Sequence, residues 1–377
     1  AAYTQTNNPM YSFGNILNQG QFTQNIDFNN PGRTDNLDLA VGAEYRFYNG
    51  GQDRARQAAA EAGIDISSAE QAGVLLQLEF EAFRAFQRIV EAQSVHRARV
   101  AALEALGSAL EVARARYAAG DLLKIDLLNL EVQLSSSQEN EIQAAHNLEL
   151  VKQIFLTLLG LPQANVSVQI AGEVNPVLPV DYSATRRPEL MQLQAALRAA
   201  EAQLYGARGS KRPTVDGFAS YQVDQGSVLN GSGDSWMAGV KVNFKLFDGH
   251  NAAADISLVE ARLGRLRAEL KKLELGLVLE VKQAELTLSQ AKQRQKVTAK
   301  MVEQADESEQ LSRARFREGV ILASDLIDVE ARLTDARVRN ALANSAVLVA
   351  IADLRRAAGL PQFEALPRPN SAVEIQP

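Results

Sequence analysis

The residues whose types could do chemistry are few and scattered. Histidine, the most versatile acid, base and metal ligand, occurs only at His96, His146 and His250, and these three have no metal-ligand spacing. Cysteine is absent, which excludes disulfides, thiolate metal sites and a cysteine nucleophile. The sequence holds neither a phosphate-binding glycine loop nor a nucleophile elbow. We therefore predict that the protein is not an enzyme and that it has no cofactor and no metal site.

Charge and hydropathy narrow the remaining classes of protein. The 377 residues have a net charge of -6, which disfavours non-specific attraction to nucleic acid. The apolar fraction is 46%, but no uninterrupted apolar run approaches the roughly 20 residues that a membrane-spanning helix needs. If the chain crosses a bilayer, we expect it to do so without helices.

Two similar sequence segments indicate an internal repeat. ARARYAAGDLLKIDLL, at residues 113–128, returns as SRARFREGVILASDLI at residues 312–327, which places Gly120 and Gly319 199 positions apart. A period this long exceeds that of solenoid repeats and indicates a duplicated unit of domain size. Other pairs at the same spacing are Gly50 and Gly249, Glu131 and Glu330, and the GLP sequences at 160–162 and 359–361.

Each copy opens with strand-like alternation of apolar and polar residues. Alternation with a period of two over about twelve residues is typical of a strand with one apolar face. Loops at 7–36 and 225–235, rich in Gly, Asn, Ser and Asp, are interpreted as hairpin connections. The four predicted strands lie at about residues 1–8, 37–48, 214–224 and 236–247.

A long helical segment without proline follows each pair of strands. Gly120 and Gly319 are predicted to end these segments, because glycine readily adopts the left-handed conformation that stops a helix. Two adjacent heptad seams, which start at Leu75 and Leu76, suit a closed ring in which each helix packs against two neighbours. The predicted helices lie at about residues 51–119, 126–159, 188–210 and 250–318.

The predicted elements favour self-association. Long helices tipped with strand hairpins leave most of their surface unburied in a monomer. Four strands with one apolar face match the wall of a transmembrane barrel, but four cannot close a pore, so several chains would share one barrel. A soluble sheet that packs its apolar face on helices would show the same alternation. Trp236, Tyr45 and Phe244 would suit an aromatic girdle of such a barrel.

The motifs and their order resemble the TolC-like outer-membrane efflux proteins. The resemblance rests on the duplicated strand and helix hairpins, the two glycine turns, GLP at each helix end, RRPEL at 186–190 and KRPTV at 211–215. It implies a mostly helical α+β fold, in which three chains build a twelve-stranded transmembrane β-barrel, four strands from each, continued by a long α-helical barrel.

The same resemblance implies a location and a function. The protein would be a homotrimer in the lipid of the bacterial outer membrane, with its helical part in the periplasm. It would give passive exit to drugs, small toxic molecules or secreted polypeptides. Its partners would be a periplasmic adaptor protein and an inner-membrane transporter, and nucleic acid would not be among them.

The repeat and the resemblance together divide the chain into segments. Copy one has no counterpart of residues 186–212, so we expect that a helical stretch precedes residue 1 in the whole protein. The strand hairpins are expected at 1–49 and 213–248, the long helical hairpins at 50–162 and 249–361, a linker at 163–186, a short helix at 187–212 and a tail at 362–377.

The resemblance assigns a candidate gate near the glycine turns. Asp325 and Asp328 match the aspartates that line the periplasmic constriction of the best-known member, and Asp126 is the corresponding residue in copy one. Carboxylates from three chains that converge on one axis repel one another and attract cations, which favours a narrow cation-selective mouth. The alternative role is helix capping, because Asp325 follows a glycine turn near a helix start.

The turns are also where the resemblance places the contact with the adaptor. Exposed apolar side chains at a helical tip would form a docking patch, and the alternative is packing that closes each hairpin. The residues concerned are Arg116, Tyr117, Gly120, Leu122, Leu123, Arg315, Phe316, Gly319, Ile321 and Leu322.

A different class of function stays open at this stage. A soluble coiled-coil scaffold, or a periplasmic adaptor-like protein with a small sheet domain, would also combine helical hairpins with strands. Adaptors normally have one helical hairpin, whereas this chain has two related ones joined to strand hairpins.

Overall fold

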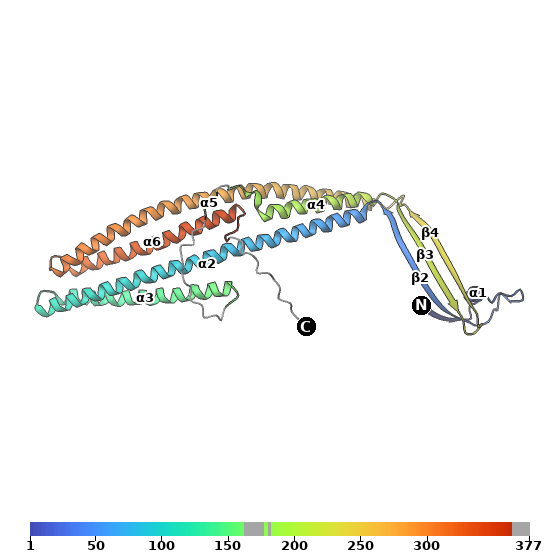
Figure 1. The fold of residues 1–377 in the computed structure, drawn as a ribbon, viewed down its shortest axis with the longest axis horizontal. Coiled ribbons are helices and arrows are strands. Elements are labelled where there is room, and N and C mark those ends of the chain that lie inside the picture. The colour runs from blue at the N-terminus through green and yellow to red at the C-terminus, as the bar shows by residue number, and fades with distance from the viewer. Residues whose placement is uncertain (162–176, 180–181, 364–377) are drawn as a thin grey trace. The chain divides into compact units, whose positions relative to one another are not determined.

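A computed structural model describes residues 1–161, 177–179 and 182–363, and the predicted linker 163–186 and tail 362–377 lie largely outside them (Figure 1). The elements are β1 (Ala2–Thr6), α1 (Pro9–Asn18), β2 (Thr34–Asn49), α2 (Gln52–Ala119), α3 (Lys124–Leu158), the 3-10 turn η1 (Ala184–Arg186), α4 (Pro188–Gly209), β3 (Thr214–Gln225), β4 (Ser232–Asn243), α5 (Asn251–Arg317) and α6 (Ala323–Ala357).

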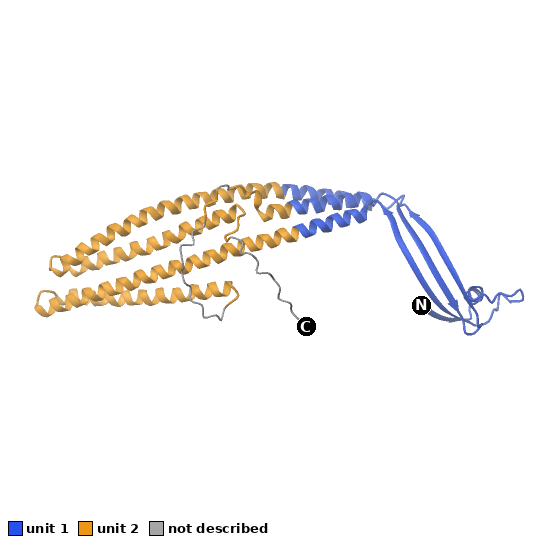
Figure 2. Ribbon diagram, in the orientation of Figure 1, with its two compact units in different colours: residues 1–65, 194–268 blue, residues 66–193, 269–377 orange. Residues whose placement is uncertain are grey.

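These elements form two compact units (Figure 2). Unit 1 holds residues 1–65 and 194–268, and unit 2 holds residues 66–193 and 269–377. The helices α2, α4 and α5 each continue from one unit into the other.

The strands of unit 1 form one antiparallel sheet in the order β1-β2-β3-β4. Both predicted hairpins are present, and β2 and β3 join them within the chain. The last strand begins and ends earlier than the alternation predicted. Asn243 pairs with Thr214, the first residue of β3, so Phe244 lies beyond the strand and has no partner on β3. The prediction that places Phe244 within a strand is therefore wrong.

The register gives the sheet one apolar and one polar face. Val41 pairs with Tyr221, and Tyr221 pairs with Trp236, so these three side chains share a face. Val41 and Trp236 are 76% and 75% exposed, which means that no helix in the described residues covers this face. On the opposite face, Arg46 forms an ion pair with Asp216 at 2.9 Å. The apolar face holds Leu39, Val41, Ala43, Tyr45, Val215, Gly217, Ala219, Tyr221, Val223, Trp236, Ala238, Val240 and Val242.

A helix occupies part of the predicted loop at 7–36. Asn8 caps α1, because its side-chain oxygen accepts a hydrogen bond from the Met10 N–H at 3.1 Å, and Pro9 takes the first helical position. Asparagine followed by proline is a helix-start signal that could have predicted α1 from the sequence. The predicted hairpin connection between β1 and β2 is present, but it contains a helix, Pro9–Asn18, that was not predicted.

The long helices end where the glycines predict. Gly120 follows α2 with a φ of 84°, and Gly319 follows α5 with a φ of 79°. The returning helices α3 and α6 have 35 residues each, and they begin at Lys124 and Ala323, 199 positions apart. The 68 residues of α2 correspond to a length of roughly 100 Å. Among the described helices, none is both long enough and apolar enough to cross a membrane.

The two seams of α2 have different surroundings within the chain. Leu76, Phe80 and Phe83 of the second seam are buried in unit 2, at 8%, 7% and 2% exposed. Leu75 and Leu78 of the first seam are 56% and 45% exposed. One seam therefore packs inside the chain, and the beginning of the other is available to a further copy.

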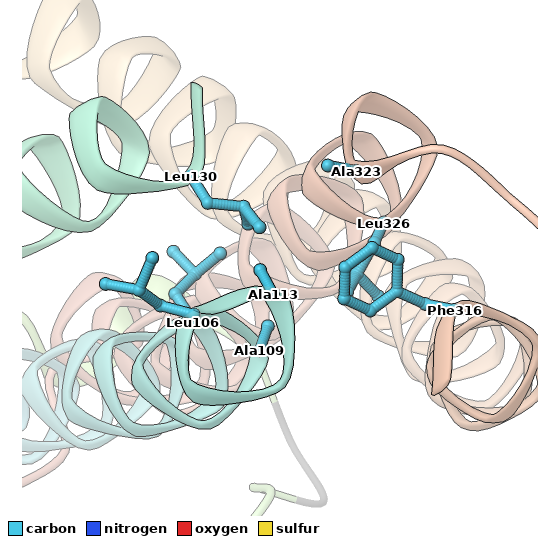
Figure 3. Packing of buried hydrophobic residues seen from close by; sticks show 8 residues of the cluster. Leu106, Ala109, Ala113, Leu130, Phe316, Ala323 and Leu326 are labelled. Carbon is cyan, nitrogen blue, oxygen red and sulfur yellow. The ribbon is translucent and has the colours of Figure 1, made fainter. Parts of the chain in front are cut away.

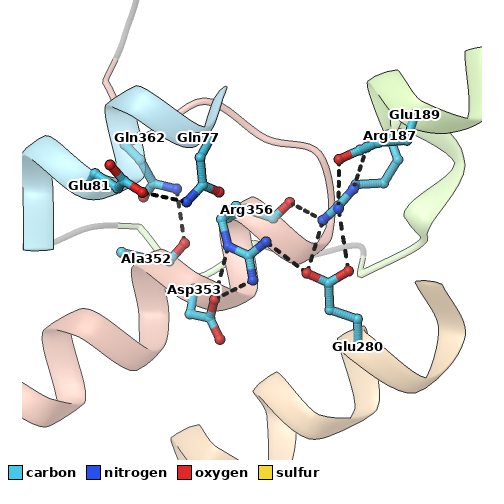
Figure 4. Close-up of polar contacts among 9 residues, drawn as sticks. All are labelled: Gln77, Glu81, Arg187, Glu189, Glu280, Ala352, Asp353, Arg356 and Gln362. Carbon is cyan, nitrogen blue, oxygen red and sulfur yellow. Dashed lines mark hydrogen bonds and ion pairs between the residues drawn. The ribbon is translucent and has the colours of Figure 1, made fainter. Parts of the chain in front are cut away.

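An ion-pair network fixes the start of α4 in unit 2 (Figure 4). Arg187 of the RRPEL motif has a side chain only 6% exposed, and it pairs with Glu189 at 2.9 Å and Glu280 at 3.3 Å. Arg356 pairs with the same Glu280 at 2.7 Å and with Asp353 at 2.7 Å. Because buried guanidinium groups need such partners, the motif ties α4 to α5 and α6.

Candidate functional site

The two helical hairpins of unit 2 meet near their turns in one apolar cluster, which we call the tip core (Figure 3). The largest member is Phe316 at the end of α5, which is 1% exposed. Because the tip core takes side chains from both hairpins, it holds the turns at Gly120 and Gly319 side by side. Its buried residues are Leu106, Ala109, Leu110, Ala113, Leu130, Phe316, Ala323 and Leu326.

Arg116 adds polar contacts between the two turns. Its Nη1 donates to the carbonyl oxygen of Phe316 at 2.9 Å, and its Nη2 donates to that of Asp121 at 3.1 Å. The guanidinium carbon also lies 5.4 Å from the centroid of the Phe316 ring, within cation–π range. Arg116 therefore links the first turn to the second and is not simply a free surface charge.

The candidate gate carboxylates lie at the start of the returning helices. Asp325 and Asp328 are exposed on α6, and Asp126 is half-buried on α3. The Asp325 carboxylate accepts a hydrogen bond from the backbone N–H of Leu322 at 3.2 Å, so the capping role weighed from the sequence is present. Asp328, on the same helix, is exposed to solvent.

The predicted docking residues fall into two groups. Phe316 is buried in the tip core, and Leu122 and Ile321 pack against it, so the alternative role of closing the hairpins holds for these three. The expectation that Phe316 is an exposed contact is wrong for the chain as described. Leu123 and Leu322 are 68% and 61% exposed. The exposed group comprises Tyr117, Gly120, Leu123, Arg315, Gly319 and Leu322, with Arg116 half-buried between the groups.

A buried acidic pair close to the second turn was missed by sequence reasoning. Glu309 on α5 and Glu330 on α6 are 6% and 3% exposed, and they share the guanidinium of Arg313 at 2.5 and 2.8 Å. The corresponding contact in copy one is the more exposed ion pair between Arg114 and Glu131, at 3.1 Å. Comparison of the two copies could have found the difference, because the residue 199 positions before Glu309 is Leu110.

Burial of Glu309 beside a second carboxylate changes its titration. Desolvation, followed by the hydrogen bond and the charge of Glu330, raises the pKa of Glu309 to about 7. Arg313 acts in the opposite direction, and Asp306 raises the pKa further. Glu330 also faces Arg99 of α2 and Asp335 of α6 across a polar cavity. Glu309 therefore keeps its proton up to about neutral pH.

We predict that Glu309 makes the stability of the helical part depend on pH. The folded chain holds the proton more tightly than the unfolded chain, because the folded-state pKa is the higher one. This contribution is complete below the ordinary value of 4.5 and is lost as the pH rises through about 7. The melting temperature, followed by circular dichroism at 222 nm, should therefore fall by a few degrees between pH 5 and pH 8.

Glu309→Leu introduces the residue type that copy one has at this position. It should remove the fall in melting temperature between pH 5 and pH 8 and leave Arg313 paired with Glu330. Glu307→Leu changes an exposed glutamate two residues away and should keep the fall. An equal pH slope in the wild type and in Glu309→Leu would contradict the assignment.

The described residues do not group three or more histidine, cysteine, aspartate or glutamate side chains into a geometry that could hold a metal ion. Within the part of the chain that the structure describes, His96 pairs with the Glu141 carboxylate at 2.9 Å. What the tips offer is a set of exposed carboxylates and apolar side chains on rigidly packed helices. Such a surface can attract cations and bind another protein.

The sequence and fold are similar to those of known proteins. Residues 181–360 match the family model described as outer membrane efflux protein. Nodulation protein T of Rhizobium leguminosarum bv. trifolii is 22% identical over 263 residues, which cover 66% of this chain and 56% of that protein. Protein CyaE of Bordetella pertussis is 24% identical over 315 residues, which cover 81% of this chain and 66% of that protein. The chain therefore spans between half and two thirds of the length of these relatives.

The fold is also that of a solved structure. The outer membrane protein VceC from Vibrio cholerae superposes with a TM-score of 0.79 at 17% sequence identity. The match covers 96% of this chain and 86% of VceC, so it includes both the sheet and the helical hairpins.

Proposed function

We propose, on the premise that this chain belongs to the TolC-like outer membrane efflux protein family, that three copies form a channel-tunnel for passive exit from the cell. The family places the chain in the bacterial outer membrane, with its helices in the periplasm. The channel would pass drugs, small toxic molecules or secreted polypeptides without chemical change, which requires no catalytic residue.

The observation that carries this proposal is the four-stranded sheet with one apolar and one polar face. A face that includes Val41 and Trp236, at 76% and 75% exposed, suits lipid and not water. β1 and β4 are the edges of the sheet, and unpaired edges do not occur in lipid. Three copies joined edge to edge give twelve strands, and the polar face then lines the bore.

The function is tested with the full chain. It should partition with the outer-membrane fraction, cross-link as a trimer in detergent and form ion-conducting channels in planar lipid bilayers. A protein that stays soluble without detergent and gives no channels would support the alternative of a soluble coiled-coil scaffold or adaptor-like protein.

The exposed carboxylates at the tips support a periplasmic gate that favours cations. In the proposed trimer, Asp328 of three copies would face one axis together with Asp325 and Asp126, and their charges would attract cations to the narrow end. Asp325 would serve both as a helix cap and as part of the gate, because its carboxylate accepts a backbone hydrogen bond from Leu322 and is still exposed.

The gate is tested by removing one carboxylate from the second sequence repeat, or by adding one at the corresponding position of the first. Asp328→Asn should lower the cation selectivity measured from the reversal potential in a potassium chloride gradient. Asn129→Asp, at the corresponding position of copy one, should raise it. Asp325→Ala should also cost about 1 kcal/mol of helix stability, since it removes the cap as well as the charge. Unchanged reversal potentials in both charge variants would refute the gate.

The exposed apolar side chains at the tips support docking of a periplasmic adaptor. Leu123, Val320 and Leu322 are 68%, 67% and 61% exposed on or beside the two turns. Large aliphatic side chains that are exposed together mark a protein contact more often than a solvated surface. An inner-membrane transporter would complete the assembly through that adaptor.

A further inference from the structure

Helix α1 lies against the polar face of the sheet in unit 1. Gln19, which is 1% exposed, donates from Nε2 to the Asp35 carbonyl oxygen at 2.6 Å and to Asn36 Oδ1 at 2.9 Å. Asn15 Nδ2 donates to Thr34 Oγ1 at 3.0 Å. Thr34 and Asn36 alternate along β2 with the apolar residues, so the side chains that α1 contacts belong to the polar face.

Three glycines, two in the turn between β3 and β4 and one at the start of β4, make room for the end of α1. A Cβ atom at Gly226 would lie 2.1 Å from Gln19 Oε1, and one at Gly233 would lie 2.1 Å from the Asn18 carbonyl oxygen. A Cβ atom at Gly231 would lie 2.5 Å from Gln21 Cγ. Because Gly233 pairs with Asp224, this contact is again on the polar face.

The helix crosses the whole width of the sheet. Near its start, Ser12 Oγ donates to the carbonyl oxygen of Thr6 on the edge strand β1 at 3.2 Å, and its end reaches Gly233 on the opposite edge strand β4. Ten residues of helix are about 15 Å long, and three gaps between four strands are about 14 Å wide. These contacts lie at the end of the sheet remote from α2, which follows Asn49 at the other end.

The side of α1 that faces away from the sheet is apolar. Ser12, Ile16 and Gln19 form the buried side, at 0%, 3% and 1% exposed. At 100° per residue, Met10 and Leu17 point away from that side, and they are 80% and 49% exposed. An apolar stripe on a helix that is otherwise anchored by buried hydrogen bonds is not needed for packing within the chain.

We propose that α1 of each copy forms a hydrophobic constriction inside the outer mouth of the channel. The proposal rests on the proposed function, because a barrel with its apolar face toward lipid has its polar face, and therefore α1, inside the bore. Met10 and Leu17 of three copies then face the axis. A ring of apolar side chains in an aqueous pore limits both the size and the hydration of what passes.

The dimensions make the constriction a narrow one. Twelve strands spaced about 4.8 Å apart and tilted about 40° enclose a barrel of about 24 Å between backbones. A helix with its side chains is about 10 Å thick. Three such helices on the inner wall would occupy most of that bore, so α1 would decide which molecules leave the outer end.

The test is the conductance of the full-length protein in planar lipid bilayers. Met10→Asp combined with Leu17→Asp should raise single-channel conductance at least twofold, because charged side chains hydrate the ring. Met10→Cys introduces a single thiol, because the chain has no cysteine of its own. Its modification by a cationic methanethiosulfonate, verified by intact mass, should at least halve the conductance, because the adduct is bulkier than methionine and its positive charge repels cations. Val41→Cys, on the lipid face, should stay unmodified and conduct as before.

The outcomes separate the two proposals. If the wild type forms trimeric channels but conductance does not change in fully modified Met10→Cys, the constriction is refuted and the channel stands. If the wild type forms no channels in any preparation, the proposed function fails and the constriction fails with it. Met10→Cys is a mild substitution at an exposed position, so it decides the question even if the double aspartate variant does not fold.

Discussion

Phe316→Ala is expected to destabilise the association of the two helical hairpins at their turns by about 3–5 kcal/mol. The Phe316 ring is 1% exposed and lies at the centre of the tip core, between side chains of both hairpins. Its removal leaves a cavity that rigid helices on either side cannot fill, and Arg116 loses the ring on which its guanidinium stacks. Hydrogen exchange of amides near residues 106–130 and 309–330 would report this loss as faster local opening.

The chain contains a matched control for this variant. Tyr117 occupies the corresponding position in copy one, 199 residues earlier, but its side chain is 42% exposed. Tyr117→Ala should therefore change the opening free energy by less than about 1 kcal/mol. Similar effects of the two substitutions would mean that Phe316 does not hold the tips together. In the proposed channel, Phe316→Ala should also increase the frequency of opening at the periplasmic end.

Val41→Arg is expected to cost about 2–4 kcal/mol of barrel stability, the largest effect that a single change on the sheet should have. Val41 lies in the middle of β2, and its side chain is on the apolar face beside Tyr221. An arginine there would place a charge near the middle of the bilayer. The fraction of assembled protein after refolding into lipid vesicles at increasing urea concentration measures the cost.

The adjacent residue is the control for the direction of the faces. Ala40 pairs with Gln222 on the polar face, so Ala40→Arg should point into water inside the barrel and should assemble nearly as well as the wild type. If Ala40→Arg destabilised the barrel more than Val41→Arg, the polar face would be the one that meets lipid. That result would overturn the proposed bore and the placement of α1 within it.

The sequence by itself determined the order and approximate ends of most elements, because their signals are local. The predicted helix at 51–119 is α2 (Gln52–Ala119), since its apolar period is uninterrupted and a glycine ends it. The β3 and β4 hairpin also follows from alternation and a glycine-rich turn. The end of β4 was misjudged because it depends on the length of β3, which supplies the partner residues. Helix α1 has a local signal at Asn8 and Pro9 that was overlooked.

Only the tertiary structure decided which of two residues at corresponding positions of the repeat is buried and which is exposed. Tyr117 and Phe316 have the same place in the repeat, yet one is exposed and the other is buried, because the second hairpin contributes its ring to a core that both hairpins share. Glu309 and Glu330 are 21 positions apart in sequence and meet because α5 and α6 fold back on each other. Periodicity predicts the faces of an element, but which face is covered depends on residues distant in the sequence, and their positions are set by packing.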